Sequence, residues 1–348
     1  MRQLGLHRAL VAVVVGTAAF AGFAPTAAAD PAGPTDYQSE VVSIEPPTST
    51  IRTGIIGGDS FFELTVEPGT EVFVIGYQGE DNIWFRADGT VWENRNSPST
   101  YLNEERLAGG RIPDHAVADA EPDWRQVAAD GNFAWHDHRA HWMQEARPFG
   151  LGPGDQILES VIPLVVDGVD VEVTVISTWE PAPSVLPAVA GIAGGIALGA
   201  AAWFLRRRSV IAALAMATPA VVVALVAGAW QFLSLPPETE PRLVWWALPA
   251  VAALSLVVGL VGAARSSTFT ADAALLFVGV ELAVWGFVKR EGLSAAIVPT
   301  AAPGALDRFA TALALGSGVV LAAVALAALF APVSGSRVPT GSQLPAHP

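Results

Sequence analysis

The sequence contains no cysteine. Disulfide bonds, thiolate catalysis, iron–sulfur clusters and cysteine-ligated zinc or blue-copper sites are therefore excluded. Any domain of this chain must be stabilised by its hydrophobic core, for which roughly 150 residues are sufficient. Phosphate loops, nucleophile elbows and paired catalytic carboxylates are not recognisable either, so the sequence favours a non-enzymatic role.

Charged residues are also scarce, at 15% of the chain, whereas hydrophobic residues make up 52%. Soluble domains contain about a quarter charged residues, so a membrane section is expected. Residues 30–183 contain 8 arginines, no lysine and 27 acidic residues, which gives a net charge of −19. Residues 184–348 contain 9 basic and 6 acidic residues, a net charge of +3. The acidic part disfavours nucleic acid and anionic lipid and is compatible with cations or basic partners.

Residues 1–29 have the pattern of a secretory signal peptide. Arg2 and Arg8 supply positive charge, an apolar run follows at 9–23, and three alanines precede Asp30. This order matches the charged, apolar and small-residue regions of a signal peptide. An uncleaved first membrane anchor is the alternative, although the apolar run is short for a span.

Residues 51–183 predict an all-β domain that lies outside the cytoplasm, preceded by a flexible lead-in at 30–50. Short strand patterns alternate with turn signals such as Asp88-Gly89, which is typical of an antiparallel β-sandwich. Residues 94–122 are polar and predict a long irregular excursion. The expected strands cover 61–66, 71–77, 83–86, 90–93, 124–128, 133–138, 157–166 and 169–179.

Residues 184–333 predict five transmembrane helices, followed by a cytoplasmic tail at 334–348. The apolar stretches are 185–205, 210–233, 243–264, 271–288 and 309–331, and each is long enough to cross a bilayer. Because Arg206 to Arg208 follow the first span, the positive-inside rule places the β domain outside and the C-terminus inside. Lys289 and Arg290 depart from this rule. The predicted location is the cytoplasmic membrane.

Three of the six histidines occur in one short segment, Trp135-His136-Asp137-His138-Arg139-Ala140-His141-Trp142-Met143. If the segment to His138 is a strand, His136 and His138 lie on one face with Cα atoms about 6.6–7 Å apart. His141 could then return as a third ligand. Neutral imidazoles without thiolates suit Cu(II) or Zn(II), with bonds of ~2.0–2.1 Å.

Other polar residues are candidates for supporting roles. Asp137 is expected to face away from the metal and to brace Arg139, while Met143 and His115 are candidate additional members of the site. The alternative is that tryptophan, histidine and arginine here form a structural cluster without metal. Proton switching or ligand recognition by the histidines is a further alternative.

Two more features have both a functional and a structural interpretation. The polar excursion at 94–104 is dense in hydrogen-bonding side chains, so it is either a binding loop or an ordinary capped loop. Glu281 lies in the middle of the fourth span. It is a candidate for proton or cation handling, or a neutral group hydrogen-bonded to a neighbouring helix.

The histidine segment, together with Ser97-Pro98-x-Thr100-Tyr101-Leu102-Asn103 and Trp124, resembles a family of exported membrane proteins from high-GC Gram-positive bacteria. The resemblance covers about residues 50–185 and implies no particular activity. The layout is also similar to the metal-bearing subunit of particulate methane and ammonia monooxygenases and to exported copper-resistance proteins. Those families use an N-terminal histidine as a copper ligand, whereas the mature chain predicted here begins at Asp30.

Two functions remain open from the sequence. The first is a membrane-anchored metal-binding protein, with copper as the leading ion and His136, His138 and His141 as ligands. The second is a cell-envelope interaction module that binds a membrane or envelope protein, with structural histidines and no metal. Neither interpretation involves nucleic acid.

Overall fold

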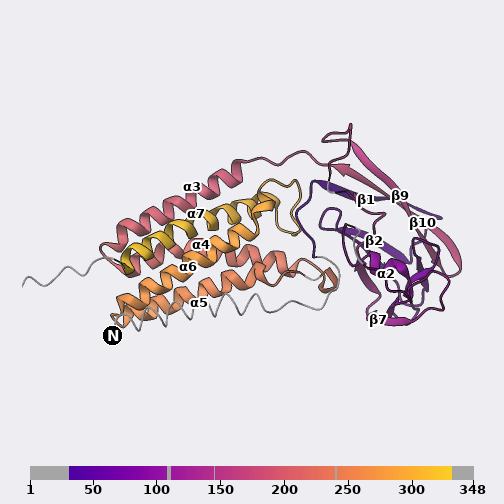
Figure 1. Ribbon diagram of the computed structural model, residues 1–348, viewed down its shortest axis with the longest axis horizontal. Coiled ribbons are helices and arrows are strands. Elements are labelled where there is room, and N and C mark those ends of the chain that lie inside the picture. The colour runs from indigo at the N-terminus through magenta and orange to yellow at the C-terminus, as the bar shows by residue number, and fades with distance from the viewer. Residues whose placement is uncertain (1–30, 108–110, 145, 240, 331–348) are drawn as a thin grey trace, which may run out of the picture.

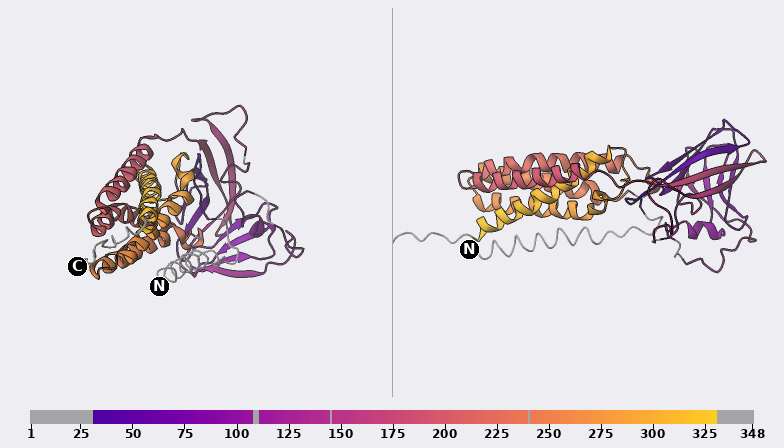
Figure 2. Two further views of the ribbon diagram at one scale, coloured as in Figure 1. Left: turned by 60° about the vertical axis from the view of Figure 1, so that its left-hand side comes forward. Right: turned by 90° about the horizontal axis from the view of Figure 1, so that it is seen from above.

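The computed structural model describes residues 31–107, 111–144, 146–239 and 241–330. A β domain lies at one end of an elongated molecule (Figure 1). A bundle of helices with roughly aligned axes lies at the other end. The same two-part arrangement is seen from above (Figure 2, right). The predicted signal peptide and cytoplasmic tail lie outside the described residues.

The β domain consists of two antiparallel sheets, with seven strands in the order β1-β10-β9-β4-β5-β6-β7 and three in the order β2-β3-β8. The strands are β1 (Tyr37–Glu45), β2 (Ile51–Ile56), β3 (Phe61–Val66), β4 (Val72–Ile75), β5 (Asp81–Phe85), β6 (Val91–Asn94), β7 (Trp124–Ala128), β8 (Asn132–Trp135), β9 (Gln156–Val166) and β10 (Val169–Trp179).

The two sheets enclose one hydrophobic core. In β10, Val171, Val173 and Val175 are buried at every second position, and Phe62 and Leu64 do the same in β3. Because alternate side chains of a strand point to the same face, this period fixes which face is internal. Each such side chain contributes about 1.5–3 kcal/mol when fully buried. The predicted β-sandwich is therefore present, with ten strands rather than seven or eight.

The lead-in expected to be flexible at 30–50 contains strand β1 instead. Tyr37 to Glu45 pair in antiparallel register with Trp179 to Glu172 of β10. The side chain of Ser39 is buried and donates a 2.6 Å hydrogen bond to the Ala140 carbonyl. The polar residues that suggested flexibility thus form a strand that pairs with β10, whose partner residues lie more than 120 positions away in sequence.

Five long helices follow the β domain, and all are long and apolar enough to cross a membrane. They are α3 (Leu186–Arg206), α4 (Val210–Leu233), α5 (Val244–Ala264), α6 (Thr268–Val288) and α7 (Gly304–Leu329). These bounds agree with the predicted spans, although α6 and α7 begin three to five residues earlier. The chain is therefore compatible with a multi-pass membrane protein.

Small residues allow α3 to pack closely on α7. A Cβ atom on Gly191 or Gly195 would overlap backbone atoms of α7, and one on Gly199 would overlap Val320. Such close approach is a common basis of helix association in membranes, because it increases van der Waals contact. The glycine pattern of the first span therefore serves packing within this chain.

A buried ion pair lies at the end of the bundle nearest the β domain. Lys289, the only lysine of the chain, pairs with Asp307, and both side chains are at most 3% exposed. The neighbouring Arg308 donates hydrogen bonds to the carbonyls of Gly292 and Ala295, at 3.1 and 2.7 Å. These contacts hold the connection between α6 and α7, which includes the short helix η2 (Arg290–Leu293).

The connection between α6 and α7 also contacts the β domain. Thr35 and Ile297 exchange two backbone hydrogen bonds of 3.1 and 2.9 Å just before β1. Phe61 of β3 is fully buried in one cluster with Leu235 and Trp245 from the connection between α4 and α5 and from α5. Polar and apolar contacts together therefore join the sandwich to the bundle.

The glycine contacts give a first test. Gly195→Ala should lower the free energy of unfolding by about 1–3 kcal/mol, because the added methyl group overlaps the Leu313 carbonyl. The matched variant Gly194→Ala should change it by less than about 0.5 kcal/mol, because its Cβ meets only the Leu313 side chain at 3.4 Å. Thermal unfolding of the detergent-solubilised protein measures both, and equal effects would contradict the packing described.

Candidate functional site

The histidine segment follows β8 but does not continue it. The strand ends at Trp135, so His136 and His138 do not occupy same-face strand positions, and the predicted strand geometry is wrong. The chain turns because Asp137 is buried and its carbonyl accepts a 2.8 Å hydrogen bond from the Ala140 amide. His136, His138 and His141 therefore lie in the loop that follows β8.

His136 is part of the domain interior. Its side chain is buried and stacks on Phe61 with ring centroids 4.0 Å apart. Its Nδ1 lies 2.5 Å from the carbonyl oxygen of Ser60, in the connection between β2 and β3. Since Phe61 also contacts the bundle, His136 lies on the side of the β domain that faces the membrane helices.

His138 is held between two other segments. Its Nε2 lies 2.9 Å from the Glu105 carbonyl, and its ring stacks on Tyr77 with centroids 5.7 Å apart. Its backbone amide donates a 2.8 Å hydrogen bond to the Tyr77 hydroxyl. The ring is therefore positioned by Tyr77, in the turn after β4, and by Glu105, which follows the short helix α2 (Pro98–Leu102).

His141 lies beside both other histidines of the segment. Its ring centroid is 6.4 Å from that of His136 and 5.5 Å from that of His138. The side chain is 1% exposed and its Nδ1 is 3.3 Å from the Trp142 carbonyl. Among the described residues, its Nε2 has no hydrogen-bond partner. Burial, aided by the positive charge of Arg106, lowers the pKa of His141 to about 3, so the ring is neutral.

Asp59 and Arg106 complete the site, although the sequence did not indicate them. The Arg106 guanidinium donates a 2.5 Å hydrogen bond to Oδ1 of Asp59, whose side chain is fully buried. Burial outweighs this ion pair and raises the pKa of Asp59 to about 6. Its Oδ2 has no hydrogen-bond partner. We use "histidine cluster" for these two residues together with His136, His138 and His141.

The expected pairing of Asp137 with Arg139 is present. Two hydrogen bonds of 2.8 Å join the groups, and the Trp135 indole donates a third bond of 3.1 Å. Burial raises the pKa of Asp137, but Arg139 and the hydrogen bonds outweigh it and hold the pKa below its usual range. Arg139 also donates to the Ile75 carbonyl at 3.0 Å. The loop is therefore braced against β4 rather than free to move.

The remaining predicted site residues lie elsewhere. His115 is exposed and its Nε2 is 3.2 Å from the Tyr101 hydroxyl, outside the histidine cluster. Met143 is half-buried two residues after His141. Glu281 is buried within α6, inside the bundle. Across the part of the chain that the structure describes, no three histidine or acidic side chains are already arranged as ligands of one metal ion.

Side chains of the polar excursion at 94–104 form hydrogen bonds within the β domain. Glu80 is buried and accepts bonds from the hydroxyls of Ser97 and Ser99 and from the Gln78 amide, at 2.7, 2.6 and 2.9 Å. Ser97 also caps α2. Burial alone would raise the pKa of Glu80, but the hydrogen bonds outweigh it and lower the pKa. This favours the capped-loop interpretation over a binding loop.

Comparison with protein-family models, curated proteins and solved structures finds no match to this chain. The resemblances drawn from the histidine motif therefore stay predictions. The class of protein that the structure defines is an antiparallel β domain joined to five helices that can span a membrane.

The Glu80 anchor gives a test of pH dependence. Glu80→Gln should lower the free energy of unfolding by about 1.5–3 kcal/mol near neutral pH, because hydrogen bonds to a buried carboxylate are replaced. The folded pKa lies below the ordinary value of 4.5, so the stabilisation is present above pH 4.5 and is lost as the pH falls through the folded pKa. The difference between wild type and variant, measured by thermal unfolding, should shrink in acid. A constant difference would contradict the assignment.

Proposed function

We propose that this protein is a membrane-anchored metal-binding protein whose histidine cluster takes Cu(II) or Zn(II). The observation that carries the proposal is the unpartnered Nε2 of His141, a buried lone pair beside two other imidazoles. Oδ2 of Asp59 is also buried without a hydrogen-bond partner among the described residues. Buried acceptors without donors are rare in proteins, and an ion bound to His141 would satisfy its Nε2.

The orientation of the rings supports this proposal. In His138 and His141, one ring nitrogen faces a backbone carbonyl, and such contacts orient histidines that bind metal through the other nitrogen. Two imidazoles on one tetrahedral ion at ~2.0–2.1 Å have centroids about 5 Å apart. The centroids of His138 and His141 are 5.5 Å apart, which is close to this value.

The chemistry of the cluster favours Cu(II) or Zn(II) over harder cations. Imidazole nitrogen is the ligand that these ions prefer when thiolates are absent. His141 is neutral at physiological pH and therefore does not need to lose a proton to bind. The positive charge of Arg106 opposes a cation, but Asp59 offsets it through the ion pair.

An envelope interaction module is the second candidate function. The stacking of His136 on Phe61 and of His138 on Tyr77 is what structural histidines would show. In that case the cluster stabilises the end of the β domain that faces the helices, and the β domain binds a membrane or envelope protein. Metal binding separates the two functions.

We also propose that the β domain lies outside the cytoplasm and the far end of the bundle inside. Arg206 to Arg208 lie at the far end, as the positive-inside rule expects. The departure at Lys289 is explained because its charge is buried against Asp307 near the β domain.

Metal binding can be measured by calorimetry on the full-length protein in detergent, with Cu(II) and Zn(II). We expect one ion per chain with a dissociation constant of about 1 μM or tighter. His138→Ala should weaken binding by about 100-fold or more, and His141→Ala should do the same, since each removes a ligand. The matched control His115→Ala should bind like wild type. No binding, or equal binding by all variants, would reject the proposal, and thermal unfolding shows whether each variant is folded.

The absence of cysteine makes the orientation directly testable. Ser49→Cys places a single exposed thiol in the β domain, and Arg208→Cys places one at the far end of the bundle. A membrane-impermeant maleimide should label the first in intact cells and the second only after permeabilisation. The reverse pattern would show that the β domain is cytoplasmic.

A further inference from the structure

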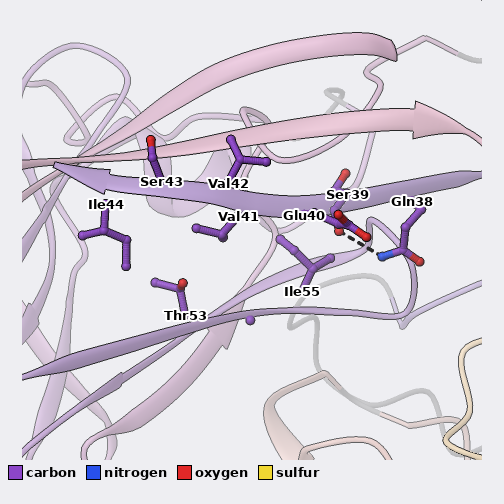
Figure 3. A pocket seen from close by; sticks show the side chains of 10 residues that line it. Gln38, Ser39, Glu40, Val41, Val42, Ser43, Ile44, Thr53 and Ile55 are labelled. Carbon is purple, nitrogen blue, oxygen red and sulfur yellow. Dashed lines mark hydrogen bonds between the residues drawn. The ribbon is translucent and has the colours of Figure 1, made fainter. Parts of the chain in front are cut away.

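An open groove separates the two sheets along one side of the sandwich. It lies between β1 and β2 and has a volume of about 630 Å³. Its lining comprises Gln38 to Ile44 and Thr53 to Ile55. In Figure 3, Val41 and Ile44 from β1 face Thr53 and Ile55 from β2 across the gap. The groove is therefore lined by both polar and apolar side chains.

Both strands beside the groove are sheet edges. Among the described strands, β1 pairs only with β10 and β2 pairs only with β3. The groove is closed at one end, where the Ser39 amide donates a 2.9 Å hydrogen bond to the Gly58 carbonyl. Beyond this point, no backbone hydrogen bond joins β1 to β2 among the described residues. Edge strands with free amides and carbonyls can take up a further strand.

Gly54 lies in the middle of β2 and lines this groove. Within the chain, a Cβ atom at this position would meet only the flexible end of Glu63, at 3.2 Å. Internal packing therefore does not require glycine here. Gly54 pairs with Glu63 of β3, so its Cβ would lie on the face of β2 away from Thr53 and Ile55. A side chain added here would leave the gap between β1 and β2 unchanged.

The negative charge around the groove favours a basic segment over a second copy of this acidic domain. Glu40 and Glu45 lie on β1, and residues 30–183 carry a net charge of −19. A second copy pairing through β1 would bring acidic side chains together, which is destabilising. A segment with lysine or arginine would instead be attracted.

We propose that this groove binds an extended, basic segment of an envelope protein partner by strand addition between β1 and β2. Backbone hydrogen bonds to the two edges give affinity, and alternate apolar side chains enter the gap beside Val41 and Ile55. Lysine or arginine side chains on the opposite face of the segment contact Glu40 and Glu45. This site is separate from the histidine cluster and does not depend on metal binding.

The test uses the full-length protein in detergent and a fluorescent nine-residue peptide of alternating valine, threonine and lysine. Its anisotropy should show saturable binding. A version N-methylated at alternate residues, which cannot donate backbone hydrogen bonds, should bind at least about tenfold more weakly, as should a version with glutamate in place of lysine. If no peptide binds, or all three bind equally, strand addition is rejected.

Two variants locate the binding site. Thr53→Trp should weaken peptide binding by about tenfold or more, because the indole ring occupies the gap between β1 and β2. Gly54→Val is the control, since its side chain lies on the opposite face of β2 and the variant should bind like wild type. Thermal unfolding shows whether both variants are folded. A peptide that binds both variants equally lies elsewhere. A concentration-dependent dimer that Thr53→Trp abolishes would show a second copy in the groove and would overturn the proposal.

Discussion

The buried ion pair between Lys289 and Asp307 is the constraint on which the arrangement of the two domains depends. Removing both charges from water is costly, and removal of one partner would leave the other uncompensated. The pair holds the connection between α6 and α7 in place, while Arg308 fixes its carbonyls. That connection pairs with Thr35, directly before β1. The bundle therefore determines where the first strand of the β domain begins.

The apolar side of this junction reaches the candidate site. Phe61 contacts Leu235 and Trp245 of the helical part and also stacks on His136. The histidine cluster thus lies at the end of the sandwich that faces the helical bundle, and Phe61 lies between His136 and the bundle.

The two candidate binding regions differ in physical character. The histidine cluster is buried, braced by Asp137 and Arg139, and rich in atoms with lone pairs. The groove is open and lined by both polar and apolar side chains, Glu40 among them. A small cation suits the former and an extended chain suits the latter, because one offers side-chain ligands and the other offers unpaired backbone. Both regions meet along β1, since Ser39 bonds to Ala140 in the histidine loop.

The sequence by itself determined the five spans, most strands and the pairing of Asp137 with Arg139. These follow from local properties: apolar length, two-residue alternation, Asp-Gly turns and opposite charges two residues apart. Only the tertiary structure decided that Tyr37–Glu45 forms a strand, that β8 ends before His136, and that Asp59 and Arg106 join the histidines. Each depends on contacts between segments tens of residues or more apart, whose geometry is set by packing of the sheets. Local sequence patterns do not indicate contacts between distant segments. The fold could therefore be largely predicted from the sequence, whereas the geometry of the histidine cluster could not.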